Sequence, residues 1–385
     1  MMIPRLLILT LFLAANLLVS HPFPAFNWLD AAGSSIKPSS AGIGVSPGAA
    51  IANPGSHKPV TKESVAQNPA SGAPVSAIPF KERPPGKLPF NASEVVWIGD
   101  SRFLFCDNNV SDSLFEMRFT PEGELGPLVR HPIRGVQPEA IDDLECMTMA
   151  ESEGLRVLFV SSSLCLKTRK PKAEDKTLRG KVSPARESFI RIKLGADGKP
   201  EAEIIPSFRS WVIQNAPILG DSHQRVPDDG GLNIEGLGWD PANRTLCFGL
   251  RSPTKDGKPI VLRVRVKDLT GTWNLSNLEM LPPVTLAIED ADGKRGIRSM
   301  EYDPSRKALL VVVGNSVSKP EAPFQLYTWD GNSEGRVERI KGLSFDPKMR
   351  PEGIAYGTIG GRGAIMLVDD RGGYRFLWND DSRLK

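Results

Sequence analysis

The stretch Asn233-Ile-Glu-Gly-Leu-Gly-Trp-Asp-Pro241 decides the fold, because near copies of it recur along the chain. The clearest copies are Gly296-Ile-Arg-Ser-Met-Glu-Tyr-Asp-Pro304 and Arg350-Pro-Glu-Gly-Ile-Ala-Tyr-Gly357. Weaker copies are Asp143-Leu-Glu-Cys-Met-Thr-Met149 and Ala92-Ser-Glu-Val-Val-Trp97. Apolar or aromatic residues stand two and four positions after the charged residue, on one face of an extended strand. Each copy therefore predicts a β-strand that carries a charged side chain near its start.

Every copy is followed by further short apolar runs separated by Gly, Pro, Asn and Asp turns, which predicts antiparallel β structure. The second runs cover residues 102–105, 156–160, 245–249, 308–313 and 364–368. The third runs cover residues 113–119, 188–194, 260–266, 325–329 and 374–378. Weaker fourth runs follow in most copies, as at 203–205 and 337–340. Units of four strands at intervals of 51, 90, 63 and 54 residues are typical of a β-propeller.

The fold class is therefore all-β, a propeller with five marked four-stranded blades. The 90-residue interval contains a basic loop at 167–186 and a short helix near 208–215. A sixth, degenerate blade in that interval stays open as an alternative, as does a two-sheet sandwich. The fifth unit lacks a convincing fourth strand, so we expect the segment around 78–82 to supply it and close the ring.

The N-terminus predicts two further segments. Residues 6–20 form an almost purely apolar run after a basic start, which is typical of a signal peptide and short for a membrane span. We therefore expect residues 1–22 to be a signal peptide or an uncleaved anchor, and the protein to be periplasmic or secreted. Residues 23–79 are rich in Ala, Gly, Ser and Pro and predict a disordered linker. The propeller is expected at 80–385.

Composition excludes several classes of protein. A net charge of +3 is too weak, and the charges too interspersed, for nucleic-acid binding by bulk electrostatics. Four cysteines without a CxxC pair exclude a zinc finger, although Cys146 and Cys165 could approach each other and form a disulfide. Only His131 and His223 lie outside the N-terminal segments, so a histidine-based metal triad is excluded and no catalytic residue can be named.

The charged residues of the five copies form the candidate site. The inner strands of a propeller begin at a common axial end, so these side chains should meet at the mouth of the central channel. The predicted ligand-binding residues are Glu94, Glu145, Glu235, Arg251, Arg298 and Glu352. A hard cation would also suit such carboxylates, since calcium accepts six to eight oxygen ligands. The predicted ligands for Ca²⁺ are Glu145, Glu235, Glu352, Asp107 and Asp369. The alternative is a structural Glu/Arg network that fixes the blades.

Five such motifs in this order, over residues 90–378, resemble the bacterial domain-of-unknown-function family numbered 3616. That family is similar to the propellers described as "esterase-like activity of phytase". The resemblance implies a propeller and, for many members, an extracytoplasmic address, without an established activity. The sequence departs from the family pattern at Cys146, where glycine is usual, and at 161–165, where a Ser-His pair is common.

Three functions follow as hypotheses. The first is an exported propeller that binds a small anionic molecule or a divalent cation at its axial mouth. The second is a calcium-dependent, phytase-like phosphoesterase, in which channel carboxylates hold a metal that activates water. The third is a scaffold for an exported protein partner, with no nucleic acid involved and with membrane contact only through an uncleaved N-terminal segment.

Overall fold

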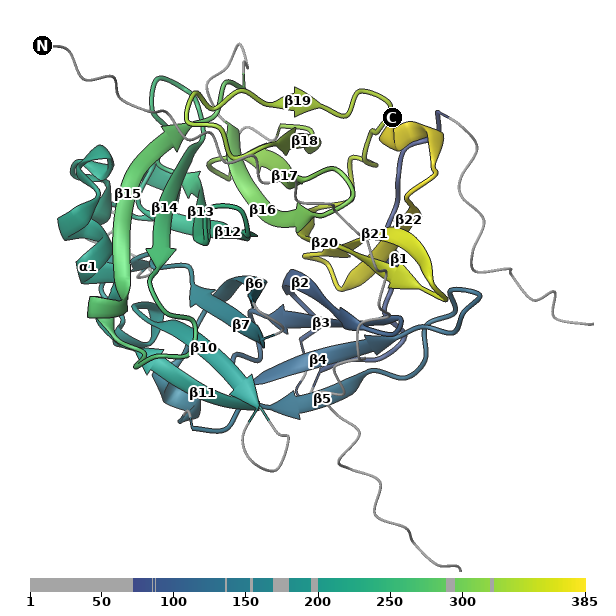
Figure 1. The fold of residues 1–385 in the computed structure, drawn as a ribbon, viewed down its shortest axis with the longest axis horizontal. Coiled ribbons are helices and arrows are strands. Elements are labelled where there is room, and N and C mark those ends of the chain that lie inside the picture. Colours follow the sequence, from purple (N-terminus) through teal and green to yellow (C-terminus); the bar gives the residue numbers. More distant parts are fainter. Residues whose placement is uncertain are drawn as a thin grey trace, which may run out of the picture.

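The computed structural model describes residues 72–84, 86, 88–135, 137–152, 155–168, 180–194, 200–288, 295–318 and 322–385. Five four-stranded antiparallel sheets make up this part of the chain, and they stand around a common axis like the blades of a propeller (Figure 1). The prediction of five blades is confirmed. The interval between the second and third copies holds no further sheet of this kind among its described residues.

Within each blade, the strands follow in order from the innermost, next to the axis, to the outermost. Blade 1 contains β2 (Ala92–Gly99), β3 (Arg102–Asp107), β4 (Ser113–Arg118) and β5 (Val129–Pro132). Blade 2 contains β6 (Leu144–Ser152), β7 (Leu155–Ser162), β10 (Phe189–Leu194) and β11 (Pro200–Ile205). Blade 3 contains β12 (Asn233–Asp240), β13 (Thr245–Ser252), β14 (Ile260–Val266) and β15 (Leu278–Thr285). Blade 4 contains β16 (Arg295–Asp303), β17 (Ala308–Asn315), β18 (Gln325–Trp329) and β19 (Glu338–Arg339).

Blade 5 is closed by the two ends of the described chain. Its inner strands are β20 (Pro351–Ile359), β21 (Arg362–Asp369) and β22 (Gly373–Trp378), and its outermost strand is β1 (Ile78–Pro79). In this pairing Ile78 lies opposite Tyr374. The prediction that a segment before the first copy closes the ring is therefore confirmed.

The propeller also extends further toward the N-terminus than residue 80. Val75 is fully buried, its N–H donates to the carbonyl of Ser344, and its carbonyl accepts from the N–H of Asp346. The expected linker boundary at 79 is thus wrong at its C-terminal end, because residues 75–79 pack into blade 5. The signal segment and residues 23–71 of the linker lie outside the described residues.

Two smaller elements interrupt blade 2 and the connection to blade 3. Strands β8 (Lys167–Thr168) and β9 (Gly180–Lys181) form a hairpin within the predicted basic loop. The predicted short helix is α1 (Phe208–Asn215), which lies on the outside of the ring (Figure 1). It buries Phe208 and Val212 in a cluster that also contains Phe189 of β10 and Phe248 of β13. The helix therefore covers the junction between blades 2 and 3.

Apolar clusters lie between neighbouring blades and hold the ring together. One joins Phe105 of blade 1 to Met366 of blade 5, and another joins Leu310 of blade 4 to Leu367 of blade 5. Burial of apolar surface stabilises such contacts by about 25 cal/mol per Å². Neighbouring inner strands follow one another around the axis in the order β2, β6, β12, β16, β20.

Candidate functional site at the axial mouth

A β-bulge recurs near the start of all five inner strands. The pairing of each inner strand with its neighbour skips one inner-strand residue at this place. A bulge bends the strand locally and re-aims the side chain of the extra residue. The residues skipped are Ser93, Glu145, Glu235, Arg298 and Glu352.

The sequence analysis aligned Glu94 with Glu145, Glu235, Arg298 and Glu352, and this alignment is wrong by one position. Ser93 is the bulge residue of blade 1, and Glu94 pairs with Cys106 one step further into the strand. The bulge residues of the other four blades are followed four positions later by Met or an aromatic residue, and Trp97 is the fourth residue after Ser93. That spacing was the sequence signal for the correct alignment.

The four remaining charged bulge residues meet at one pocket of about 250 Å³ at the axial end of the ring. Arg251, which was also predicted to bind a ligand, lines this pocket as well. Sequence reasoning missed the loop and strand-end residues that complete the wall. They are Asn91, Asn108, Ser318, Phe324, Arg350 and Asp370, and Asn315 at the end of β17 lines the pocket as well.

Arg298 is the centre of the charge network in this pocket. Its side chain is 6% exposed, its Nε lies 2.8 Å from Oε2 of Glu235, and its Nη2 pairs with Oε1 of Glu352. Glu235 also accepts from Nη1 of Arg251 at 2.9 Å and from Nδ2 of Asn233 at 3.0 Å. Burial lowers the pKa of Arg298 to about 10, which leaves the guanidinium charged at neutral pH. Blades 3, 4 and 5 are thereby joined through one cation.

Glu145 has a different environment. Its Oε1 accepts a hydrogen bond from Nδ2 of Asn108 at 2.7 Å, across the boundary between blades 1 and 2. Burial, followed by the nearby carboxylates of Asp143 and Glu235, raises the pKa of Glu145 well above its ordinary value. Burial raises the pKa of Asp370 as well. Both carboxyl groups are thus easier to protonate than a carboxyl in water, and a protonated carboxyl can donate a hydrogen bond.

Asp107 and Asp369 were predicted as metal ligands, but they do not line the pocket. Both carboxylates accept hydrogen bonds from the backbone of the adjoining loops. Asp107 accepts from the N–H groups of Asn91 (2.6 Å) and Asn109 (2.9 Å). Asp369 accepts from those of Arg350 (2.6 Å) and Arg371 (2.9 Å). The two aspartates therefore shape the loops that present Asn91, Asn108, Arg350 and Asp370 to the pocket.

The donor set does not fit a resident calcium ion. Within the described ranges, no three Asp, Glu, His or Cys side chains are grouped closely enough to hold a metal. Arg298 stands between Glu235 and Glu352, and Arg251 takes a further oxygen of Glu235. Glu235 and Glu352 are thus compensated by guanidinium groups rather than left for a cation.

Glu94 lies beneath the pocket, inside the channel. It is fully buried, and its Oε1 accepts from Oγ of Ser299 (2.7 Å) and from the N–H of Ile354 (3.0 Å). The equivalent positions in the other blades hold the small residues Cys146, Gly236, Ser299 and Gly353. A Cβ on Gly353 would come within 2.8 Å of Cα of Glu94. One long side chain therefore fills the space that four small residues leave open.

Cys146 and Cys165 do not form the disulfide that the sequence left open, since all four cysteines are free and buried. Cys165 lies beside a second charged cluster, where Nη1 of Arg186 is 3.2 Å from its sulfur and 3.0 Å from Oδ2 of Asp143. Burial raises the pKa of the Cys165 thiol to about 12. The thiol is therefore protonated and weakly nucleophilic at neutral pH.

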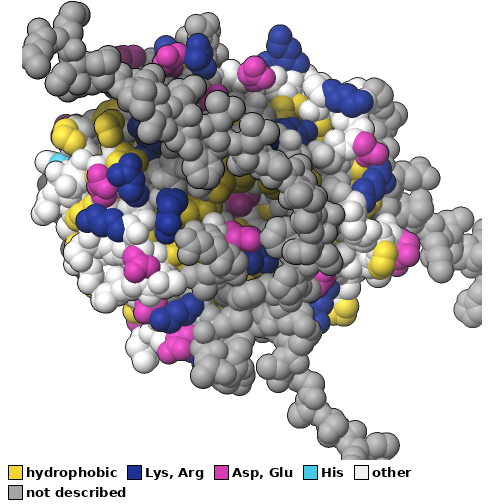
Figure 2. Space-filling model, viewed as in Figure 1, with side chains coloured by type: hydrophobic (Ala, Val, Ile, Leu, Met, Phe, Trp, Pro, Cys, Tyr) yellow, Lys and Arg dark blue, Asp and Glu magenta, His cyan; other side chains and the backbone are white. Residues whose placement is uncertain are grey.

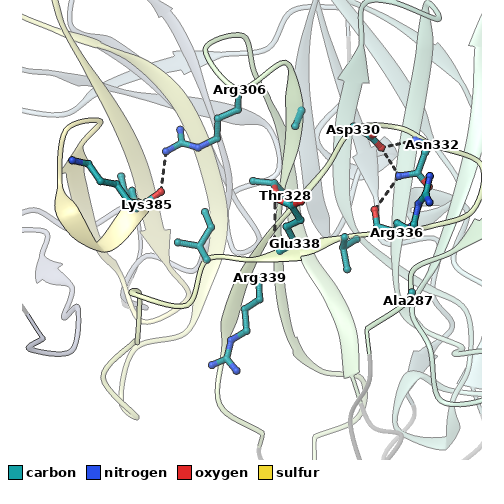
Figure 3. Close-up of a pocket in the computed structure, with 13 residues that line it drawn as sticks. Ala287, Arg306, Thr328, Asp330, Asn332, Arg336, Glu338, Arg339 and Lys385 are labelled. Atoms are coloured by element: carbon teal, nitrogen blue, oxygen red, sulfur yellow. Dashed lines mark hydrogen bonds between the residues drawn. The ribbon is translucent and has the colours of Figure 1, made fainter.

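A larger cavity of about 780 Å³ lies away from the axis, over β18, β19 and the last residues of the chain (Figure 3). Its polar side chains mostly bond to their own neighbourhood. Asn332 donates to the carbonyl of Arg336, and Arg306 pairs with Asp303 and donates to Asn379. The five blades do not converge on this cavity, so the axial pocket is the stronger candidate.

Charged side chains of both signs are interspersed over the described part of the face shown in Figure 2. This agrees with the absence of a basic footprint in the sequence. No helix among the described residues is long and apolar enough to cross a membrane.

The known structures to which the chain is similar include several distant ones. No family model and no curated protein matches the chain, so the resemblance to the family numbered 3616 stays a prediction. The major Malassezia sympodialis allergen Mala s 1 is 10% identical over 76% of this chain and 94% of its own, with a TM-score of 0.40. An N-acetylgalactosamine deacetylase from F. plautii is 11% identical over 80% of this chain and 94% of its own, with a TM-score of 0.36.

The Dos1 propeller is 8% identical over 74% of this chain and 56% of its own, with a TM-score of 0.28. Likenesses at this level carry no argument about activity. The strand pairing itself shows the fold: the chain forms a five-bladed β-propeller.

Proposed function

We propose that the axial pocket binds a small anionic molecule, on a protein that its apolar N-terminal run directs out of the cytoplasm. The observation that carries this proposal is the convergence of Arg251, Arg298 and Arg350 on one small pocket. Guanidinium groups bind carboxylates and phosphates through paired hydrogen bonds, more strongly than neutral donors do. A small anion can use the edge of Arg251 that Glu235 leaves open.

The partners of Arg251 support this role. Its Nη1 bonds to Glu235, while its Nε is buried and has no hydrogen-bond partner within the described residues. Burying a donor without a partner costs about 1–3 kcal/mol. A bound anion would supply the missing acceptor and recover that free energy.

The competing proposal keeps a divalent cation in the pocket, and with it a phytase-like phosphoesterase. The pairing of Glu235 and Glu352 with Arg298 favours anion binding over this alternative. In a scaffold without a small ligand, Nε of Arg251 would stay without an acceptor, and no bound molecule would offset the free-energy cost.

Isothermal titration calorimetry of the full chain with inorganic phosphate and with citrate tests the proposal. We expect saturable binding that weakens at least tenfold in Arg251→Gln. Arg265→Gln is the matched control, because Arg265 forms an exposed pair with Glu279 on blade 3. Binding that survives Arg251→Gln, or that is lost equally in Arg265→Gln, would contradict an axial anion site.

A further inference from the structure

The cationic side chains that line the axial pocket and two of its amides come from different blades. Cationic lining residues come from blades 3, 4 and 5, namely Arg251, Arg298 and Arg350. Among the described residues, blade 1 contributes two amides, Asn91 and Asn108, and no charged residue, whereas the carboxylates of the pocket come from blades 2, 3 and 5 and a third amide, Asn315, from blade 4. In a ring of five, blade 1 stands opposite the junction of blades 3 and 4 (Figure 1). The pocket therefore has a guanidinium end, formed by Arg251 and Arg298 of blades 3 and 4, and an amide end at blade 1, with Arg350 of the neighbouring blade 5 beside the amide end.

In the described ranges, buried polar atoms without a hydrogen-bond partner lie at both ends; Nε of Arg298 and Oε2 of Glu235 are two of them, but these two lie only 2.8 Å from each other. Oδ1 of Asn91 accepts no hydrogen bond and Nε of Arg251 donates none within the part of the chain that the structure describes. One is an acceptor and the other is a donor. A ligand that satisfies both must itself donate at one end and accept at the other. An acidic group accepts at the guanidinium end, and a hydroxyl group can donate to an amide oxygen.

The wall also limits the size and shape of the ligand. A volume of about 250 Å³ falls below the roughly 300–1,000 Å³ of pockets for drug-sized ligands. Phe324 is the single apolar lining residue among those that the structure describes, and the guanidinium carbon of Arg298 lies 5.8 Å from the centre of its ring. The pocket thus offers one apolar surface within an otherwise polar wall, which suits a compact ring that carries hydroxyl groups on its edge.

We infer that the ligand is a polyhydroxylated anion of about one sugar ring, such as a sugar acid or a sugar phosphate. Its acidic group lies at Arg251 and Arg298, and its hydroxyl groups lie at Asn91 and Asn108. Nδ2 of Asn108 already donates to Glu145, so the carbonyl oxygen of this amide is the atom that meets a ligand hydroxyl. This inference rests on the proposed anion site and adds the hydroxyl end to it.

Calorimetric titration of the full chain with six probes tests the inference. Glucuronate and glucose 6-phosphate carry both features, acetate and inorganic phosphate carry only the anion, and glucose and inositol carry only hydroxyl groups. We expect glucuronate to bind at least tenfold tighter than acetate, or glucose 6-phosphate at least tenfold tighter than phosphate. Which of the two pairs shows the difference identifies the acidic group.

Variants at the amide end separate this inference from the anion site itself. Asn91→Ala and Asn108→Ala should weaken the hydroxylated anion by about tenfold each, the loss of one or two hydrogen bonds, and leave the simple anion unchanged. Asn91→Ala removes a buried atom without a partner, so the fold should tolerate it. The exposed Asn215→Ala on α1 is the control. Simple anions that bind as tightly as hydroxylated ones would overturn the inference and leave the anion site standing. Failure of every anion to bind would overturn both.

Discussion

Oε1 of Glu94 accepts a hydrogen bond from Oγ of Ser299 at 2.7 Å, across the channel between the inner strands of blades 1 and 4. Both residues stand one step beyond the bulge in their strands. Oε2 of Glu94 has no partner within the described residues. The carboxyl group is therefore held by donors on one oxygen only, in a place that water does not reach.

The ionisation of Glu94 should make stability depend on pH. Burial raises the pKa of Glu94 well above its ordinary value of 4.5, and the nearby carboxyl of Glu301, whose pKa burial also raises, adds to the shift. The folded state then binds more protons than the unfolded state, so stability falls as pH rises above about 4.5. The fall is about 1.4 kcal/mol per pH unit for one proton, and it stops at the folded-state pKa.

Glu94→Gln should remove the part of this dependence that is due to Glu94. We expect the variant to have a higher melting temperature than the wild type at pH 8 and a similar one at pH 5, measured by circular dichroism. Glu279→Gln, an exposed outer-strand residue, should change neither value by a comparable amount. Equal slopes for Glu94→Gln and the wild type would contradict a neutral buried carboxyl at this position.

Loss of the central cation should strongly destabilise the ring. Arg298→Met leaves Glu235 and Glu352 buried without their main partner, which costs about 3–5 kcal/mol in the free energy of unfolding. Urea unfolding at pH 7 measures this cost. Arg265→Met breaks an exposed pair and should cost about 1 kcal/mol or less. Equal effects of the two substitutions would show that the axial network contributes no more than a surface pair.

Calcium should raise the melting temperature of the Arg298→Met variant and leave that of the wild type unchanged. Because guanidinium groups compensate the carboxylates, we expect the melting temperature of the full chain to be the same in millimolar calcium and in EDTA. In Arg298→Met the carboxylates are released, and calcium should then raise the melting temperature, since a ligand of the folded state stabilises it. A calcium-dependent rise in the wild type that is abolished by Glu235→Gln would restore the metal site and the phosphoesterase hypothesis.

The N-terminal closure of blade 5 should depend on Val75. Val75→Ala removes two methyl groups from a fully buried site and should cost about 2 kcal/mol. Val182 is 45% exposed and gives the matched control, with an expected change of less than about 0.5 kcal/mol. Chemical denaturation of the two variants compares them. A negligible effect of Val75→Ala would mean that the ring closes without this segment.

The repeat was readable from the sequence because each inner strand carries the same apolar spacing after its bulge. The closing strand could be predicted because the sequence of the fifth unit contained no convincing fourth apolar run. The position of the bulge in blade 1 was harder to predict, since Val95 and Val96 are both apolar and fit either alignment of Ser93 and Glu94, which leaves Trp97 as the deciding residue. Alternation alone cannot separate two registers that differ by one residue when both faces are buried.

The amide end of the pocket was equally hidden from the sequence. Asn91 and Asn108 lie just outside β2 and β3, in loops whose direction depends on the hydrogen bonds of Asp107. The same holds for Asp370, which follows β21 and turns with the loop that Asp369 holds. Strand periodicity says nothing of where such a loop residue points. The two aspartates were chosen as metal ligands for their charge, whereas the structure uses them to bind backbone.

The pairing of Ile78 with Tyr374 also governs when the protein can finish folding. The two partners stand roughly 300 residues apart, so β1 must wait for β22 to leave the ribosome before it has an edge to join. Blades 1 to 4 each complete their sheets from consecutive strands or across a single insertion and can form during synthesis. Blade 5 and the axial pocket, which takes Arg350 and Glu352 from it, are completed last. A chain cut short within its final strands would therefore lose closure of the ring rather than one outer strand.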